Sequence, residues 1–367
     1  MAIRAKQKLA YILHEVAIGG AELAFLSALP NLHHQFDLQV YVLGKVDPGL
    51  LEPYPPEIKR RIISYPYPSW MGLLIMPLVL RRIHQFRPDI VISSLWRSAM
   101  LASIYKKRQT RVQYFLFLHS SVYFHKPDRY FLKRAMKRAD VILADSAASK
   151  KLALRDAPAQ TPVEIVSMLI NPSPATPPVH AFTPPYRILF AGRLHKVKNI
   201  PLAISAIAWL RKQGMDIVFD IYGRDNGEIH TIRERIQQEQ MEAHIQLKGE
   251  INPNLKETLQ QQYPFYLQLS HDEGMAMSVA EAMQAGAVCF VSPVGEIPAY
   301  AEDHVSAIFM KPDTPESWQQ SLNTMMATLR NPETCRKVSQ EAYRAFLEKP
   351  LYHESLINHL IHHTKSS

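Results

Sequence analysis

Several features that define other classes of protein are rare or missing in this 367-residue chain. It has only two cysteines, Cys289 and Cys335, so we expect no disulfide framework and a reducing compartment. Its longest apolar run, Trp70–Leu80, is interrupted by Pro77 and is too short to span a bilayer. Met1–Lys8 leads directly into an amphipathic strand, so no signal peptide is expected. These absences predict a cytoplasmic protein.

Two sequence motifs are also missing. The chain contains no Asp-x-Asp, so a diphosphate held by a metal ion is not indicated, and we expect no metal and no cofactor. It contains no G-x-G-x-x-G either, which excludes the usual dinucleotide fingerprint. The basic residues show no regular interleaving with aromatic residues of the kind that would stack bases, so nucleic acid is not an expected partner.

The composition is that of a globular protein with an uneven charge. Hydrophobic residues make up 47% and charged residues 20% of the chain. Residues 1–170 contain 24 Lys and Arg against 12 Asp and Glu, a net charge of +12, whereas residues 171–367 contain 18 against 21, a net charge of −3. A basic half is typical of contact with nucleic acid, an anionic membrane or an anionic substrate, although solubility alone also explains such an excess.

Strand-like and helix-like segments alternate along the chain, which predicts doubly wound α/β domains. A proline-rich stretch at residues 171–185 cannot join a sheet and separates two such series. We expect an N-terminal domain at residues 1–172, a second domain at 173–345, and a helical segment at 346–367 that packs back on the first. The expected strands are residues 9–13, 38–43, 89–94, 112–118, 141–144, 163–166, 186–191, 217–223, 244–250, 265–269 and 287–291.

The most informative stretch runs from residue 265 to 291. Two apolar runs flank a loop and a helix-like segment, so the loop follows the carboxyl end of a strand and faces the first amides of a helix. Such places bind anions in open α/β sheets. Two carboxylates, Glu273 and Glu281, flank the loop and can accept hydrogen bonds from sugar hydroxyls. An alternative is that Glu281 belongs only to a capping box with Ser278.

A second motif follows the strand-like run at residues 186–191. Gly192 permits a turn, and Arg193 and Lys198 lie close beyond it. Two fixed cations at a strand end suit a diphosphate.

Together these motifs resemble retaining glycosyltransferases with the GT-B fold, and most closely glycosyltransferase family 4. The Glu-x7-Glu stretch and the Gly-Arg-Leu-x-x-x-Lys-Asn stretch carry the resemblance, which is tight over residues 187–300 and looser before them. It implies two Rossmann-like domains facing across a cleft. One departure is Ala276, where the family often has Gly or Pro.

The resemblance also implies roles for individual residues. The first glutamate of the pair contacts the donor sugar and the second holds the nucleotide ribose. The Gly19-Gly20 loop faces the donor phosphates and the acceptor, and a histidine at a strand end, here His119, lies near the reacting centre. The implied catalytic residues are His119 and Glu273, and the implied donor-binding residues are Gly19, Gly20, Arg193, Lys198, Gly223, Glu273, Gly274, Met275, Ala276, Met277 and Glu281.

The sequence therefore predicts a metal-independent retaining glycosyltransferase with a nucleotide-sugar donor and a glycan or glycolipid acceptor, in cell-envelope or polysaccharide synthesis. Two alternatives stay open: a sugar-nucleotide epimerase of the same architecture, and a non-catalytic sugar-nucleotide-binding subunit. A basic segment at residues 126–138, with Phe131 and Met136 among its cations, predicts peripheral contact with the anionic cytoplasmic face of a membrane. A solvated helix face has the same composition.

Overall fold

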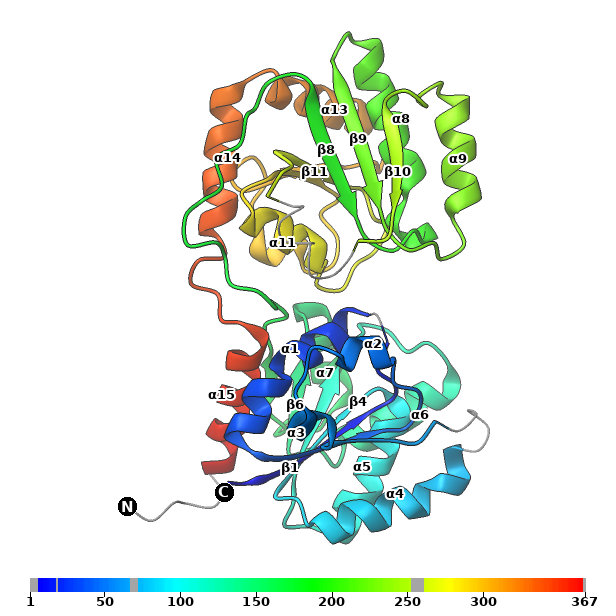
Figure 1. Cartoon of the computed structure of the whole chain (residues 1–367), viewed down its shortest axis with the longest axis vertical. Coiled ribbons are helices and arrows are strands. Elements are labelled where there is room, and N and C mark those ends of the chain that lie inside the picture. The colour runs from blue at the N-terminus through cyan, green and yellow to red at the C-terminus, as the bar shows by residue number, and fades with distance from the viewer. Residues whose placement is uncertain (1–5, 18, 67–71, 252–260, 366–367) are drawn as a thin grey trace. The chain divides into compact units, whose positions relative to one another are not determined.

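The computed structural model describes residues 6–17, 19–66, 72–251 and 261–365. The chain forms two compact units (Figure 1). Unit 1 contains Met1–Ile170 and Pro350–Ser367, and unit 2 contains Asn171–Lys349. Unit 2 therefore begins with the proline-rich stretch, and the chain returns to unit 1 for its last residues.

Unit 1 is built on a seven-stranded sheet, all of whose pairings are parallel, in the order β3-β2-β1-β4-β5-β6-β7. Its strands are β1 (Lys8–Leu13), β2 (Asp37–Val42), β3 (Ile62–Ser64), β4 (Ile90–Ser94), β5 (Gln113–Leu118), β6 (Val141–Ala144) and β7 (Val163–Ile165). The order reverses between β1 and β4. This reversal is the topological switch point at which open α/β sheets bind ligands.

Helices cover both faces of this sheet, because neighbouring side chains of a strand point to opposite faces. They are α1 (Gly20–Gln35), α2 (Pro48–Leu51), α3 (Pro56–Lys59), α4 (Gly72–Phe86), α5 (Trp96–Arg108), α6 (Lys126–Met136), α7 (Ala147–Asp156) and α15 (Tyr352–Lys365). On β1, Ala10 and Ile12 pack in one hydrophobic cluster with Leu101 of α5. Tyr11, between them, instead contacts Phe25 of α1, with ring centroids 4.7 Å apart.

The C-terminal helix α15 completes unit 1. Tyr352, at its start, is 1% exposed, and its backbone N–H donates to the carbonyl of Leu169 at 2.7 Å. The Tyr352 ring stacks on Phe117 of β5 at a centroid distance of 6.2 Å. Near the other end, the side-chain amide of Gln113 donates to the carbonyl of His363 at 2.9 Å. The helix is thus fixed along its length to strands that precede it by hundreds of residues.

Unit 2 has a six-stranded parallel sheet in the order β10-β9-β8-β11-β12-β13, which reverses between β8 and β11. Its strands are β8 (Tyr186–Ala191), β9 (Ile217–Tyr222), β10 (Ile245–Gly249), β11 (Phe265–Gln268), β12 (Val288–Val291) and β13 (Ile308–Phe309). Its described helices are the 3-10 turn η2 (Lys196–Lys198), α8 (Ile200–Lys212), α9 (Ile229–Gln238), α11 (Met277–Gln284), α12 (Ile297–Tyr300), α13 (Pro315–Leu329) and α14 (Pro332–Arg344).

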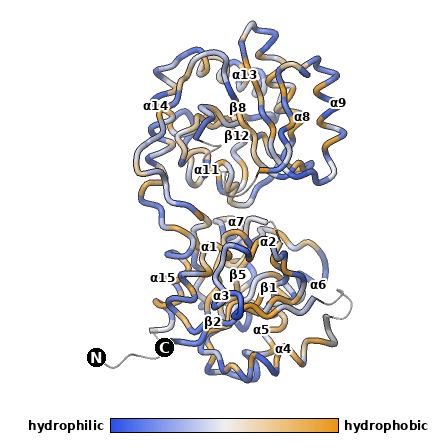
Figure 2. The backbone as a smooth tube through the Cα atoms, viewed as in Figure 1, coloured by the Kyte–Doolittle hydropathy of each residue, from blue (hydrophilic) through white to orange (hydrophobic). Residues whose placement is uncertain are grey.

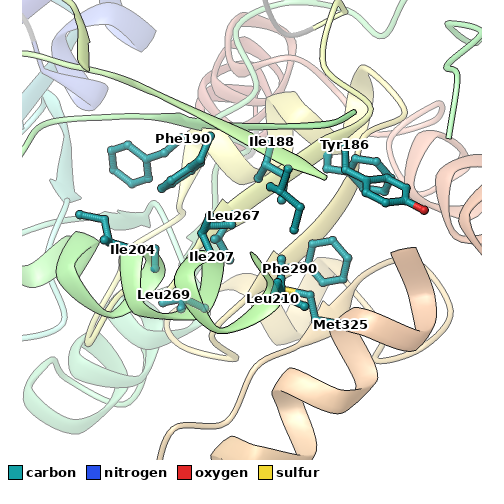
Figure 3. Packing of buried hydrophobic residues seen from close by; sticks show 14 of the residues in the cluster. Tyr186, Ile188, Phe190, Ile204, Ile207, Leu210, Leu267, Leu269, Phe290 and Met325 are labelled. Atoms are coloured by element: carbon teal, nitrogen blue, oxygen red, sulfur yellow. The ribbon is translucent and has the colours of Figure 1, made fainter. Parts of the chain in front are cut away.

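The core of unit 2 is a continuous apolar cluster between its sheet and helices (Figure 3). Ile188 and Phe190 of β8 face Ile207 of α8, and Met325 of α13 closes one side. In both units the hydrophobic residues gather on the central strands (Figure 2). This burial holds each sheet rigid and fixes the loops at the carboxyl ends of its strands.

The α/β class expected from the sequence is confirmed, with differences in detail. The expected strands are present, but β3 and β13 were not foreseen, since they contain only three and two residues. The helical pattern of residues 318–362 forms three helices. One break falls where the Asn331 side chain caps α14, accepting hydrogen bonds from the backbone N–H groups of Glu333 and Thr334.

The apolar run Trp70–Leu80 was expected to be too short to span a bilayer. Trp70 and Met71 lie outside the described residues, and Gly72 begins α4. Within the described part of the chain, none of the helices has the length and apolar character needed to cross a membrane.

Candidate active site

The carboxylate of Glu273 lies at the centre of a polar cluster in unit 2. It follows β11, while Lys198 ends the turn that follows β8. The Lys198 ammonium donates to both oxygens of Glu273, at 2.6 and 2.8 Å. The side-chain amide of Gln268 donates to Oε1 at 2.8 Å, and the Ser270 hydroxyl donates to the same oxygen. Because β8 and β11 flank the switch point, this cluster occupies the place where such sheets bind ligands.

The ion pair in this cluster is largely shielded from solvent. The exposed fraction is 14% for the Lys198 side chain and 8% for that of Glu273. Water screens such a pair much less than it screens an exposed one. Because four hydrogen bonds hold the carboxylate, its position is set before any ligand arrives.

Two tyrosines lie near Glu273: Tyr266, which is buried, and Tyr300, which is half-buried. Burial, together with the nearby carboxylates of Glu273 and Glu281, raises the pKa of Tyr266 well above its usual value. Burial and the charge of Glu273 likewise raise the pKa of Tyr300. The Tyr266 hydroxyl lies 3.0 Å from Oε1 of Gln268 and 3.1 Å from the Ala191 carbonyl, so it ties the residues around Glu273 to the end of β8. Both phenols therefore stay neutral hydrogen-bond donors.

The loop from Gly274 to Met277 lies open on one side and is supported on the other. A Cβ added to Gly274 meets nothing within 4 Å, whereas one added to Gly295 would lie 2.2 Å from the carbonyl oxygen of Glu273. Only glycine, which has no Cβ, lets the backbone at position 295 lie this close to the Glu273 carbonyl. The backbone N–H of Glu296 donates to the Gly274 carbonyl at 2.9 Å.

Helix α11 begins at Met277, and its N-cap is Ala276 in the left-handed conformation (φ 52°, ψ 54°). Ser278 is therefore inside the helix, and the alternative that it caps the helix in a box with Glu281 is wrong. Glu281 is half-buried and lies near the Tyr266 hydroxyl, whose pKa its charge helps to raise. The first backbone N–H groups of α11, from Met277 on, directly follow this loop.

Arg193 and Gly223 lie on the neighbouring loops after β8 and β9. Arg193 is exposed, and among the described residues its guanidinium has no hydrogen-bond or ion-pair partner, so it is available to a ligand. A Cβ on Gly223 would lie 1.7 Å from the carbonyl oxygen of Gly192. Gly223 thus lets the two loops touch, a structural requirement that the sequence motif did not reveal.

In unit 1, His119 extends from the carboxyl end of β5. Its Nε2 lies 3.3 Å from the Ser94 hydroxyl, and its Nδ1 lies 3.8 Å from Oδ2 of Asp145, too far for a hydrogen bond. Burial favours the neutral form of Asp145, but His119 and the hydroxyls of Ser149 and Ser146 outweigh burial and lower the pKa of this carboxyl. The arrangement places a carboxylate behind the imidazole and leaves Nδ1 unpaired among the described residues.

His119 lines a small pocket at the switch point of unit 1. The pocket also includes His14, Glu15, Glu22, Ser94 and Leu95. Burial, and then the positive charge of Arg97, lower the pKa of His14, which favours its neutral form. Gly19 caps α1 next to Glu22, and Gly20 begins the helix, so the Gly-Gly loop borders this pocket.

The predicted site residues thus form two groups. Gly19, Gly20 and His119 lie in unit 1, and the others lie in unit 2. Sequence reasoning missed Gln268, Ser270, Tyr266 and Tyr300 around Glu273, and His14, Glu22 and Ser94 around His119. Gln268, Ser270, His14 and Ser94 lie within one residue of the end of a predicted strand, which is the signal that could have found these four.

Both halves of this chain match models of known protein families. Residues 18–174 match the family model described as Glycosyltransferase Family 4, and residues 175–345 match Glycosyl transferases group 1. A segment of 102 residues is 35% identical to the GtfA subunit of the UDP-N-acetylglucosamine–peptide N-acetylglucosaminyltransferase of Streptococcus pneumoniae. That segment is 28% of this chain and 20% of the relative, so the match spans about a fifth of the relative's length.

Two solved structures are similar over nearly the whole chain. HepE from Anabaena, in complex with UDP, has a TM-score of 0.79 and 15% identity, over 98% of this chain and 100% of HepE. The lipopolysaccharide outer core galactosyltransferase WaaB, without ligand, has a TM-score of 0.73 and 18% identity, over 97% of this chain and 99% of WaaB. Since two family models together cover residues 18–345 and these structures share both α/β units, the chain belongs to the glycosyltransferases of family 4 (group 1), with the GT-B fold.

Proposed function

We propose that this protein is a retaining glycosyltransferase that moves a sugar from a uridine diphosphate sugar to a hydroxyl group of a glycan or glycolipid. The observation that carries the proposal is the shielded Lys198–Glu273 ion pair at the switch point of unit 2. The similarity to HepE, whose structure contains UDP, supports uridine as the base. The chain has no Asp-x-Asp, so protein cations take the role of a metal ion.

The donor site follows from the chemistry of its residues. An ammonium group has three N–H donors. Glu273 takes two of those of Lys198, which leaves one for a phosphate oxygen. Arg193 and the first amides of α11 add donors to the diphosphate, Glu273 accepts from the donor sugar, and Glu281 accepts from the ribose. As the bond from the anomeric carbon to the diphosphate breaks, these donors stabilise the growing negative charge.

The acceptor binds in the pocket of unit 1. His119 and His14 both line it, and the neutral form that is favoured for His14 can accept a proton or a hydrogen bond from a hydroxyl. The Gly19-Gly20 loop leads directly into Ala21 and Glu22, which line the same pocket. WaaB is a lipopolysaccharide outer core galactosyltransferase, and its similarity supports an acceptor that belongs to the cell envelope.

The protein works at the cytoplasmic face of a membrane, held there by α6 and the segment before it. Val122, Phe124 and Tyr130 are 54%, 74% and 60% exposed, which is unusual for large apolar side chains. Exposed cations lie among them at Lys126, Arg129, Arg134 and Lys137. Apolar side chains that enter a headgroup region beside cations are typical of peripheral binding.

Two of the cations expected on this surface are engaged elsewhere. Lys133 pairs with Asp156 at 3.0 Å, and the guanidinium of Arg138 donates to the Ser103 hydroxyl at 2.9 Å. These two residues therefore contribute less to docking than the four exposed cations.

The function is tested by a screen of nucleotide sugars. Binding is measured first, by the rise in unfolding temperature, and turnover is then measured by release of UDP with candidate acceptors. Nuclear magnetic resonance of the product determines whether the anomeric configuration is retained. Conversion of the donor without any acceptor would indicate an epimerase, and binding without turnover on every acceptor would indicate a non-catalytic subunit.

A further inference from the structure

Three metal-ligating side chains converge where α15 lies beside β7 in unit 1. His359 and His363 of α15 and Glu164 of β7 each bring one ligand atom within 4.8 Å of the others. The histidines are four residues apart, so they lie on one face of the helix. Glu164 precedes His363 by 199 residues and meets it only in the fold. All three side chains are half-buried, and none belongs to the donor or acceptor sites described above.

The ligand atoms already point at the same part of β7. Nε2 of His359 lies 3.1 Å from the carbonyl oxygen of Ile165, and Nε2 of His363 lies 3.3 Å from Oε1 of Glu164. Since both neighbours are acceptors, each Nε2 carries a hydrogen in this arrangement. A metal ion that replaces these two protons would find two imidazole nitrogens and a carboxylate oxygen on one side.

We propose that His359, His363 and Glu164 form a zinc site that fastens α15 to the edge of the sheet. Two imidazoles and one carboxylate are an established ligand set for Zn²⁺, whereas Mg²⁺ and Ca²⁺ prefer oxygen ligands alone. Bonds of about 2.0 to 2.2 Å in a tetrahedron separate the ligand atoms by roughly 3.4 Å. The ligand atoms lie within 4.8 Å of one another, so shifts of about 1 Å at each atom are enough to reach that separation. The fourth position is left for water.

The position of the site indicates a fastening role rather than catalysis. The residues between the histidines are Leu360, Ile361 and His362, so the glutamate that serves as general base in H-E-x-x-H hydrolases is missing. β7 is the last strand in the order of its sheet, and α15 is the segment with which the chain returns from unit 2. A zinc ion would link this returning helix to an edge strand, in addition to the contacts that Tyr352 makes near the start of the helix.

The test measures zinc binding to the full-length chain without an affinity tag. Protein is freed of metal with a chelator and titrated with ZnCl₂ against a chromophoric competitor, and Co²⁺ absorption in the visible range reports the coordination. We expect one zinc ion per chain. His359→Ala, His363→Ala and Glu164→Gln should each weaken the affinity by about tenfold or more, because each removes a ligand. His353→Ala, a half-buried histidine of the same helix, is the matched control and should bind zinc as the wild type does.

Circular dichroism and the unfolding temperature in chelator establish that each variant is folded before binding is compared. His363→Asn, which keeps a polar side chain of smaller size, serves if His363→Ala does not fold. Absence of binding at micromolar zinc overturns the proposal. The proposal is also overturned if His353→Ala loses as much zinc affinity as the ligand variants do. That result would indicate that zinc binds nonspecifically to several histidines. Both results leave the glycosyltransferase proposal untouched, since that is measured by donor binding and turnover.

Discussion

The orientation of Glu273 depends on side chains from two separate segments. Lys198 comes from the turn after β8, while Gln268 and Ser270 come from β11 and the residues that follow it. Because each of them donates to the carboxylate, the acceptor atoms that would meet a sugar are fixed in the free protein. Such preorganisation costs no rearrangement when charge develops in a reaction.

Loss of either cation at the donor site should slow turnover strongly. Lys198→Ala and Arg193→Ala are each expected to lower kcat by a factor on the order of a hundred, as removal of one donor to a developing charge does. Lys196→Ala, an exposed lysine of the same turn, is the matched control and should keep its rate. Initial rates of UDP release measure all three. Wild-type rates in both site variants would show that neither cation has the assigned role. A large effect of a chelator on the initial rate of His363→Ala, which lacks a ligand of the proposed zinc site, would indicate a catalytic metal.

Glu281 is expected to act on donor affinity rather than on folding. Glu281→Gln removes a charged acceptor from the proposed ribose site, and a hydrogen bond to a charged group contributes about 1.5 to 3 kcal/mol, so Kd for the donor should rise about tenfold or more. Calorimetric titration with UDP measures this change. Glu341→Gln, at a half-buried carboxylate of α14 that pairs with Arg344, is the control. An unchanged Kd for the donor in Glu281→Gln would mean that Glu281 does not bind the ribose.

At the scale of elements, the strained point of the donor site is the start of α11. Ala276 is in the left-handed region, which costs a residue with a Cβ about 1 to 2 kcal/mol. It is also the position where the sequence departs from the family pattern, in which Gly or Pro is frequent. The loop therefore has a left-handed residue at position 276 even though alanine is strained in that conformation. Tyr300, whose hydroxyl lies 3.4 Å from the Ala276 carbonyl, helps to hold it there.

Ala276→Gly should therefore stabilise unit 2. The relief of strain exceeds the extra entropy of a glycine in the unfolded chain, and the free energy of unfolding should increase by about 1 kcal/mol. Ala280→Gly, inside α11, should have the opposite effect, since glycine is poor in helix interiors. Denaturant unfolding of the two variants beside the wild type measures both. Destabilisation by Ala276→Gly would mean that the methyl group, which is buried, contributes more than the strain costs.

The surface formed by Val122, Phe124, Tyr130 and the exposed cations of α6 should bind anionic membranes. We expect co-sedimentation with phosphatidylglycerol vesicles but not with phosphatidylcholine vesicles. Binding should weaken with salt, because the Debye length falls from about 10 Å at 0.1 M to about 3 Å at 1 M. Serine at Lys126, Arg129, Arg134 and Lys137 should reduce it. Serine at Lys133 and Arg138, which have internal partners, should reduce it less. Equal binding to both kinds of vesicle, or none, contradicts the proposal.

At the scale of the whole molecule, each unit has its own sheet, hydrophobic cluster and switch point. The residues assigned to the donor diphosphate and ribose lie in unit 2, apart from the Gly19-Gly20 loop. The chain nevertheless passes through unit 1 twice, because α15 packs against β5 and β7. Because each unit has its own sheet and hydrophobic cluster, hydrogen exchange can report stability and ligand binding for each unit separately.

UDP should stabilise unit 2 selectively. A ligand at a hundred times its Kd adds about 2.7 kcal/mol to the stability of the part that binds it. Hydrogen exchange in saturating UDP should therefore slow in β8, β11 and α11, with smaller changes in β5 and β6. Lys198→Ala should lose most of this protection. Protection confined to unit 1 would contradict the placement of the diphosphate site.

The sequence by itself determined the α/β class and the residues that carry the family resemblance. Alternating strands and helices follow from hydrophobic periodicity, which is local, and Arg193, Lys198, Glu273 and Glu281 lie in motifs whose spacing can be read along the chain. The expected strands were therefore placed correctly, while the shortest ones, β3 and β13, gave too little pattern to detect.

Only the tertiary structure decided which side chains meet. Lys198 reaches Glu273 across 75 residues because β8 and β11 pair in the sheet, and Gly223 is needed because the loop after β9 touches Gly192. The start of α11 at Met277, which removes the capping-box alternative for Glu281, depends on how the loop before it is supported. The sequence shows the spacing of His359 and His363 but not their meeting with Glu164, since only the packing of α15 beside β7 brings these distant residues together.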